Sequence, residues 1–174
     1  GWSVTTGGSG MFHAIRVTDP KNPINQIFFL LKAQPLLHSE TGKDYYRQSY
    51  QMYGGNYNMM AAAPVLSPAS TENFFKIFNS FASFAKTYEP TYSSFDFPSF
   101  GSFKTVESFA SSSSMKSQAI GPALLRATFS DTAGNKGEGL FTADVIDFSG
   151  NTASGFGIDA GFYMIYNIAA ITCE

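Results

Sequence analysis

The sequence contains very little cysteine and few charged residues. Cys173 is the single cysteine among 174 residues, so no disulfide can form within the chain, and zinc sites that need paired cysteines are excluded. Charged residues make up 14% of the chain, well below the roughly 25% that is usual in globular domains. The 11 basic residues are spread singly and the formal net charge is −2. Because no basic cluster can neutralise phosphates, we expect no nucleic-acid partner.

Long apolar runs are missing as well. No stretch approaches the roughly 18 to 20 apolar residues that cross a membrane, so we expect no transmembrane segment. The start, GWSVTTGGSG, is too polar for a signal peptide, and the chain stops directly after the strand-like residues 162–172. We therefore interpret the chain as a mature or trimmed fragment whose signal peptide and tail are missing.

Aromatic residues are abundant. They form 16% of the chain, and 18 residues are phenylalanine. This content excludes a disordered chain, and the length fits one domain over residues 1–174. With so few charges, the polar surface must come from Ser, Thr, Asn, Gln, Gly and Tyr. That composition favours an exported protein, in the extracellular space or at the cell envelope.

Apolar periodicity predicts the strands. Residues 11–18 alternate and predict a half-buried strand, whereas 24–33 and 162–172 are apolar on both faces and predict central strands. Further strands are predicted at residues 103–110, 123–131 and 138–148.

Two helices are predicted between the early and late strands. One begins at Ser39 or Thr41 and stops at Gly54. The other covers STENFFKIFNSFASFAK, residues 70–86, where Phe75 lies beside the apolar stripe as a candidate partner contact. The stripe itself predicts one buried face and consists of Phe74, Ile77, Phe78, Phe81, Phe84 and Ala85.

The order of these elements, two strands, two helices and four strands, predicts an α+β fold. We expect a mostly antiparallel sheet of about six strands packed against two or more helices.

Catalytic signatures are weak. His13 is predicted to be half-buried in a strand, and His38 follows a strand as a surface or pocket residue. Neither has the spacing of a metal ligand, and no GxSxG motif is present. We predict no catalytic residue, metal or cofactor, and favour a protein that is not an enzyme.

Among the carboxylates, Asp144 shares a sheet face with apolar residues, so we expect an ion pair with Arg126 on the neighbouring strand.

The aromatic residues supply the candidate binding surface. Tyrosine rings are flat and amphipathic, which suits a glycan or peptide ligand, although the same rings can also fill a core around long loops. The predicted binding residues are Tyr45, Tyr46, Tyr50, Tyr53, Tyr57, Tyr88, Tyr92 and Phe95.

Three long segments carry a family resemblance: RVTDPKNPINQIFFLLKAQPLLHSETGK, APVLSPASTENFFKIFNSFASFA, and LLRATFSDTAGNKGEGLFTADVIDF followed by YMIYNIAAIT. They resemble a group of uncharacterised exported proteins of gut Firmicutes. In that group the final strand runs into a closing helix, which this sequence lacks. The strand–turn–strand pattern is also similar to PsbP-like domains, which implies an antiparallel sheet sandwiched by helices. Neither resemblance implies a catalytic residue.

The predicted function is therefore non-catalytic binding of a protein, peptide, glycan or small ligand by an exported or envelope-associated domain. One alternative is a hydrolase-type enzyme with a site near the Gly-rich loop 149–161, and another is a purely structural module. The oligomeric state stays open.

Overall fold

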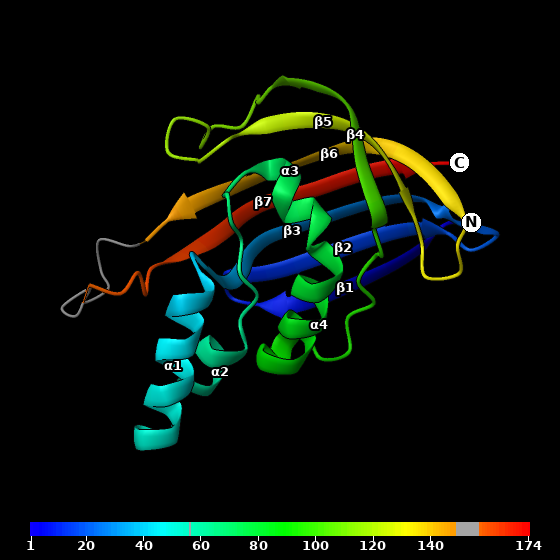
Figure 1. Ribbon diagram of the computed structural model, residues 1–174. Helices are drawn as coiled ribbons and strands as arrows, with labels where there is room; N and C mark the ends of the chain where they lie inside the picture. Colours follow the sequence, from blue (N-terminus) through cyan, green and yellow to red (C-terminus); the bar gives the residue numbers. More distant parts are fainter. Residues whose placement is uncertain (56, 149–156) are drawn as a thin grey trace.

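The computed structural model describes residues 1–55, 57–148 and 157–174. Within these ranges the chain forms one seven-stranded sheet with four α-helices, which confirms the predicted α+β class (Figure 1). The additional strand is β1, Ser3–Ser9, which pairs with β2 at the edge of the sheet. Apart from Val4 its residues are polar or glycine and mostly exposed, so the sequence showed no apolar alternation there.

Every neighbouring pair of strands in the sheet is antiparallel, in the order β1-β2-β3-β7-β6-β5-β4. The chain makes one meander of three strands and one of four, and β7 of the second meander pairs with β3 of the first. The two segments predicted as central strands are these two. The other bounds are β2 Phe12–Asp19, β3 Asn22–Leu37, β4 Gly101–Ala110, β5 Ala123–Ser130, β6 Lys136–Asp147 and β7 Phe162–Cys173.

The first helix, α1 (Glu40–Tyr53), begins and ends at the predicted residues. The Ser39 hydroxyl accepts a hydrogen bond from the Gly42 backbone amide and so caps the helix. Gly54 ends it with φ 63°, a conformation that favours glycine. A short helix, α2 (Tyr57–Ala62), follows and packs against α1.

The predicted helix over residues 70–86 consists of two helices, α3 (Thr71–Lys76) and α4 (Phe78–Tyr88). They meet at Ile77, whose φ and ψ are −105° and 10°. After this break α3 packs on β4, β5 and β6, whereas α4 packs on β3. Phe75 is therefore fully buried, and its ring lies 5.1 Å from that of Phe141. The prediction that Phe75 lies beside the buried stripe and contacts a partner is wrong.

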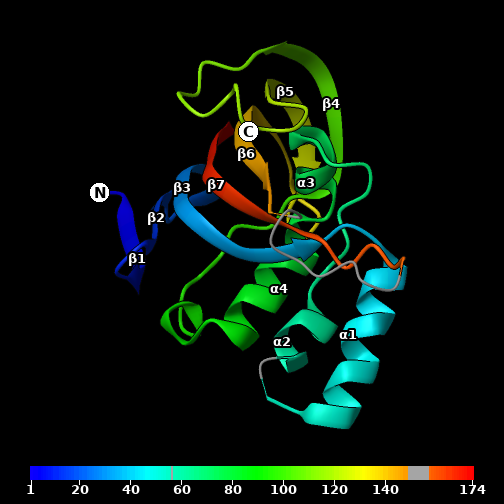
Figure 2. The ribbon, with the colours of Figure 1, turned by 90° about the vertical axis from the view of Figure 1, so that its left-hand side faces the viewer.

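The core lies between one face of the sheet and the helices α3 and α4. Figure 2 shows both helices on the same side of the curved sheet, with α1 and α2 beyond its end. The segment after α4 contains a 3-10 helix (Pro90–Tyr92) and covers the rest of that face. An ion pair attaches the segment to β2, since Nη1 of Arg16 lies 2.6 Å from Oδ2 of Asp96. The opposite face of the sheet keeps several large apolar side chains exposed, among them Ile27 and Ile171.

Candidate functional site

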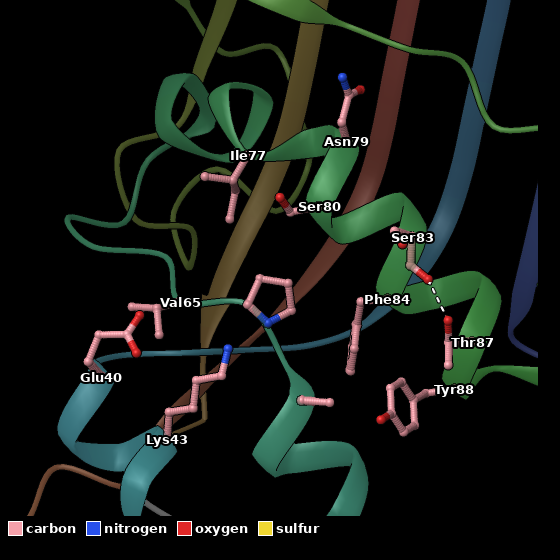
Figure 3. Close-up of a pocket in the computed structure, with 12 residues that line it drawn as sticks. Glu40, Lys43, Val65, Ile77, Asn79, Ser80, Ser83, Phe84, Thr87 and Tyr88 are labelled. Carbon is pink, nitrogen blue, oxygen red and sulfur yellow. Dashed lines mark hydrogen bonds between the residues drawn. The ribbon is translucent and has the colours of Figure 1, made fainter. Parts of the chain in front are cut away.

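A cleft of about 720 Å³ opens between α1 and α2 on one side and α4 on the other (Figure 3). The break at Ile77 sets the direction of α4, and the chain between α2 and α3 lines the floor at Pro64 and Val65. This volume is in the range that binds small ligands. The lining residues are Glu40, Lys43, Ala62, Pro64, Val65, Ile77, Asn79, Ser80, Ser83, Phe84, Thr87 and Tyr88.

The α4 wall of the cleft carries neutral polar side chains next to aromatic ones. Ser80, Ser83 and Thr87 recur three and four residues apart, so they share one side of the helix, and all three are exposed. The Thr87 hydroxyl donates to the backbone carbonyl of Ser83 at 3.0 Å and keeps its lone pairs for a further donor (Figure 3). The wall thus offers both donors and acceptors.

Phe84 and Tyr88 lie on the same wall, with ring centroids 5.2 Å apart and an interplanar angle of 36°. Both point from α4 toward α2 (Figure 3). Phe84 is almost completely buried, whereas Tyr88 is partly exposed. Tyr88 therefore presents an aromatic surface to the cleft while Phe84 fixes its position.

The opposite wall contributes the charged side chains of the cleft. Glu40 and Lys43 come from the first turn of α1, and Figure 3 shows both side chains on the α1 side of the cleft, across from α4. Their opposite signs leave the cleft without a formal net charge. An ionic ligand of either sign is therefore not selected over a neutral one.

The predicted tyrosine surface is divided in the structure. Tyr88 lines the cleft. Tyr45, Tyr46, Tyr53 and Tyr57 form a chain of ring contacts between α1 and α2, with centroid separations of 5.4 to 6.5 Å. Tyr50, Tyr53 and Tyr57 are exposed on these helices, and Tyr45 is partly exposed.

Tyr46 has a structural role. It is buried, and its hydroxyl donates to the carbonyl of Ala160 at 2.6 Å, which attaches α1 to the chain entering β7. Burial raises the pKa of Tyr46, and the neighbouring Tyr45 and Tyr57 raise it further.

Tyr92 and Phe95 do not reach the surface. Tyr92 is fully buried, and its hydroxyl donates to the carbonyl of Lys32, while Phe95 packs with it under the sheet at 6.5 Å between ring centroids. The prediction that these two residues bind a ligand is wrong, because the segment after α4 places them in the core. The alternative interpretation, that aromatic rings fill a core around long loops, holds for this pair.

His38 lies between two carboxylates that the sequence did not connect with it. Its Nε2 is 3.0 Å from Oδ1 of Asp147, and its Nδ1 is 3.0 Å from Oδ1 of Asp159. The ring of Tyr163 lies over the imidazole at 4.2 Å between centroids. Burial raises the pKa of Tyr163, and the charges of Asp147 and Asp159 raise it further. The order β3-β7-β6 brings these residues together, so only knowledge of the sheet could have revealed the cluster.

Both ring nitrogens of His38 are thus occupied, and only 9% of its side chain is exposed. A general base needs a free nitrogen within reach of the substrate, so this arrangement fits a structural link better than catalysis. The adjacent Ser39 hydroxyl donates to the carbonyl of Asp159 while it caps α1.

The alternative hydrolase site was predicted near loop 149–161, of which residues 149–156 lie outside the described residues. His13 is exposed on β2, not half-buried as predicted.

The ion pair predicted between Asp144 and Arg126 does not form. A bulge after Thr142 turns Asp144 toward Ser113 and Asn167, whose side chains donate to its Oδ2. Instead, Nε of Arg126 lies 3.6 Å from Oε2 of Glu107 on β4. Its Nη1 lies 4.0 Å from Oε2 of Glu138, near the start of β6.

Among the described residues, no three His, Cys, Asp or Glu side chains are placed to hold a metal ion. No helix in the described part of the chain has the length and apolar character needed to cross a membrane. Comparisons with protein-family models, with curated proteins and with solved structures find no match to this chain.

Proposed function

We propose that the protein binds a small, neutral, polar ligand of the oligosaccharide class in the cleft between α1–α2 and α4, without catalysing a reaction. The observation that carries the proposal is the position of Tyr88 beside the row of Ser80, Ser83 and Thr87 on one side of α4. A sugar ring packs its C–H face on a tyrosine ring and directs its hydroxyls sideways to such donors and acceptors.

Charge and size support the same ligand class. The cleft contains one acid and one base from α1, Glu40 and Lys43, so it has no net charge to select a phosphate or an ammonium group. Its volume of about 720 Å³ can hold a few sugar units. An extracellular or cell-envelope location, expected from the composition, belongs to the same proposal because such domains encounter glycans.

The test is a screen of neutral oligosaccharides by saturation-transfer NMR, followed by calorimetry on each ligand that binds. Tyr88→Ala is expected to weaken binding about tenfold, which is the effect of losing one stacked ring. The matched control is Tyr53→Ala, because Tyr53 is 72% exposed on α1 and does not line the cleft. Absence of binding across the screen, or an equal loss in both variants, would contradict the proposal.

A catalytic function has one observation in its favour, the position of His38 between Asp147 and Asp159. The same oligosaccharides, incubated with the protein and analysed by mass spectrometry, distinguish the two functions. If the protein binds its ligand without catalysing a reaction, each oligosaccharide is recovered intact. Cleavage that His38→Asn abolishes would assign an enzyme instead.

A further inference from the structure

The sheet face opposite to α3 and α4 carries a continuous apolar surface, which we call the open face. Strand pairing places its side chains next to one another: Ile15 opposite Phe29, and Ile171 opposite both Ile27 and Leu140. Val4 on β1 and Leu31 on β3 extend the surface. The open face is thus defined by Val4, Ile15, Ile27, Phe29, Leu31, Leu140 and Ile171.

These side chains are unusually accessible for large apolar residues of a sheet. Their exposed fractions lie between 36% and 59%. The helices α3 and α4 pack on the other face of the sheet, and the segment 112–114 after β4 borders the open face at Phe29. The neighbouring strand residues Phe28, Leu30 and Ile168, which point to the other face, are 1% exposed or less. Strands with large apolar residues on both faces are typical of sheets that are covered on both sides.

The exposed area is large enough for a specific interface. With roughly 200 Å² for a fully exposed large apolar residue, the seven side chains present on the order of 600 Å², so two such faces would bury about 1,200 Å². That total reaches the range of specific protein–protein interfaces. A patch of this size is also at the upper limit for a monomer.

The charges at the border of the open face show which partner it fits. Arg126 lies beside Glu107 and Glu138, so both signs are present at the same corner and partly neutralise each other. The surface therefore selects neither an acidic nor a basic partner. A second copy of the same face matches its apolar character and its area.

We propose that the open face is the interface between two copies of this chain, which pack sheet to sheet in a twofold dimer. Two sheets that pack face to face keep their strand directions within about 30° of each other, with the apolar side chains interdigitated. Each copy would leave its cleft at α4 accessible, because the cleft lies on the other side of the sheet. This inference does not rest on the proposed ligand.

The test is the molar mass of the full chain in solution, measured by light scattering and by sedimentation velocity over a wide concentration range. The wild-type protein is expected to have the mass of two chains. Ile171→Lys places a charge at the centre of the interface twice per dimer, and is expected to raise the dissociation constant roughly a hundredfold or more. The matched control is Met52→Lys, because Met52 is 71% exposed on α1, and this variant should remain a dimer.

A milder substitution at the same position controls for misfolding of the lysine variant. Ile171→Thr keeps a β-branched residue and is expected to remain folded by circular dichroism while its dimer weakens about tenfold or more. A wild-type chain that stays monomeric at the highest concentration would overturn the proposal. So would a folded Ile171→Lys or Ile171→Thr variant with an unchanged dimer dissociation constant.

Discussion

The side-chain amide of Asn167 donates a hydrogen bond to Oδ2 of Asp144 at 2.9 Å, from one central strand to the next. Asp144 is 1% exposed, and Ser113 donates to the same oxygen from the loop after β4. Burying a carboxylate is costly unless donors satisfy its oxygens; here two neutral side chains satisfy Oδ2, while the buried Oδ1 accepts no hydrogen bond from the described residues. The two neutral side chains take the place of the expected arginine.

Asn167 adopts a left-handed backbone conformation, φ 50°, inside a strand. Asn167→Gly and Asn167→Ala both remove the hydrogen bond to Asp144, but only alanine keeps a Cβ that is strained at this φ. We expect the alanine variant to be less stable than the glycine variant by about 1 kcal/mol, measured by urea denaturation. Equal stabilities would show that the backbone conformation is not retained in solution.

His38 is expected to stabilise the end of the sheet by linking Asp147 and Asp159. His38→Ala removes both contacts and leaves the two carboxylates facing the cavity of the lost ring. We expect a loss of roughly 1–3 kcal/mol in the free energy of unfolding. His13→Ala is the control, since His13 is exposed on β2, and should change stability by less than about 0.5 kcal/mol. If the two variants were equally stable, His38 would have no structural role.

Phe75 lies at the centre of an aromatic cluster formed by α3, β4 and β6. Its ring is 5.6 Å from that of Phe103 and 5.1 Å from that of Phe141. Phe75→Ala should cost about 3–5 kcal/mol because a cavity remains in a packed core. Phe109→Ala, at a site that is 43% exposed on β4, should cost less than about 1 kcal/mol. Thermal and urea denaturation compare the two, and a small effect at Phe75 would place its ring outside the core.

Local sequence signals predicted the elements that depend on local chemistry. The cap at Ser39 and the stop at Gly54 defined α1, and apolar residues on both faces indicated the central strands β3 and β7. The break at Ile77 was not visible, because the spacing of the apolar residues continues through it. β1 was not visible either, because its mostly polar residues form a strand through pairing with β2.

The candidate site was predicted only in part, because it depends on tertiary structure. Tyr88 was among the predicted binding residues, but the polar row beside it becomes a wall only when α1 and α2 lie opposite α4. Tyr92 is chemically the same residue and is buried, since the chain after α4 folds back under the sheet. Residue type alone cannot separate these two outcomes. The cluster around His38 likewise requires the order of the strands.

The most direct test of the central claim, that the α4 cleft is a ligand-binding site, is a map of backbone amide chemical shifts during titration with an oligosaccharide that binds. The account predicts that the shifts concentrate on residues 79–88 and 40–43, on the two walls of the cleft. It also predicts that Tyr88→Ala raises the ligand concentration needed for these shifts about tenfold, while Tyr53→Ala leaves it unchanged. Shifts confined to the open face or to the surroundings of His38, with residues 79–88 unchanged, would contradict it.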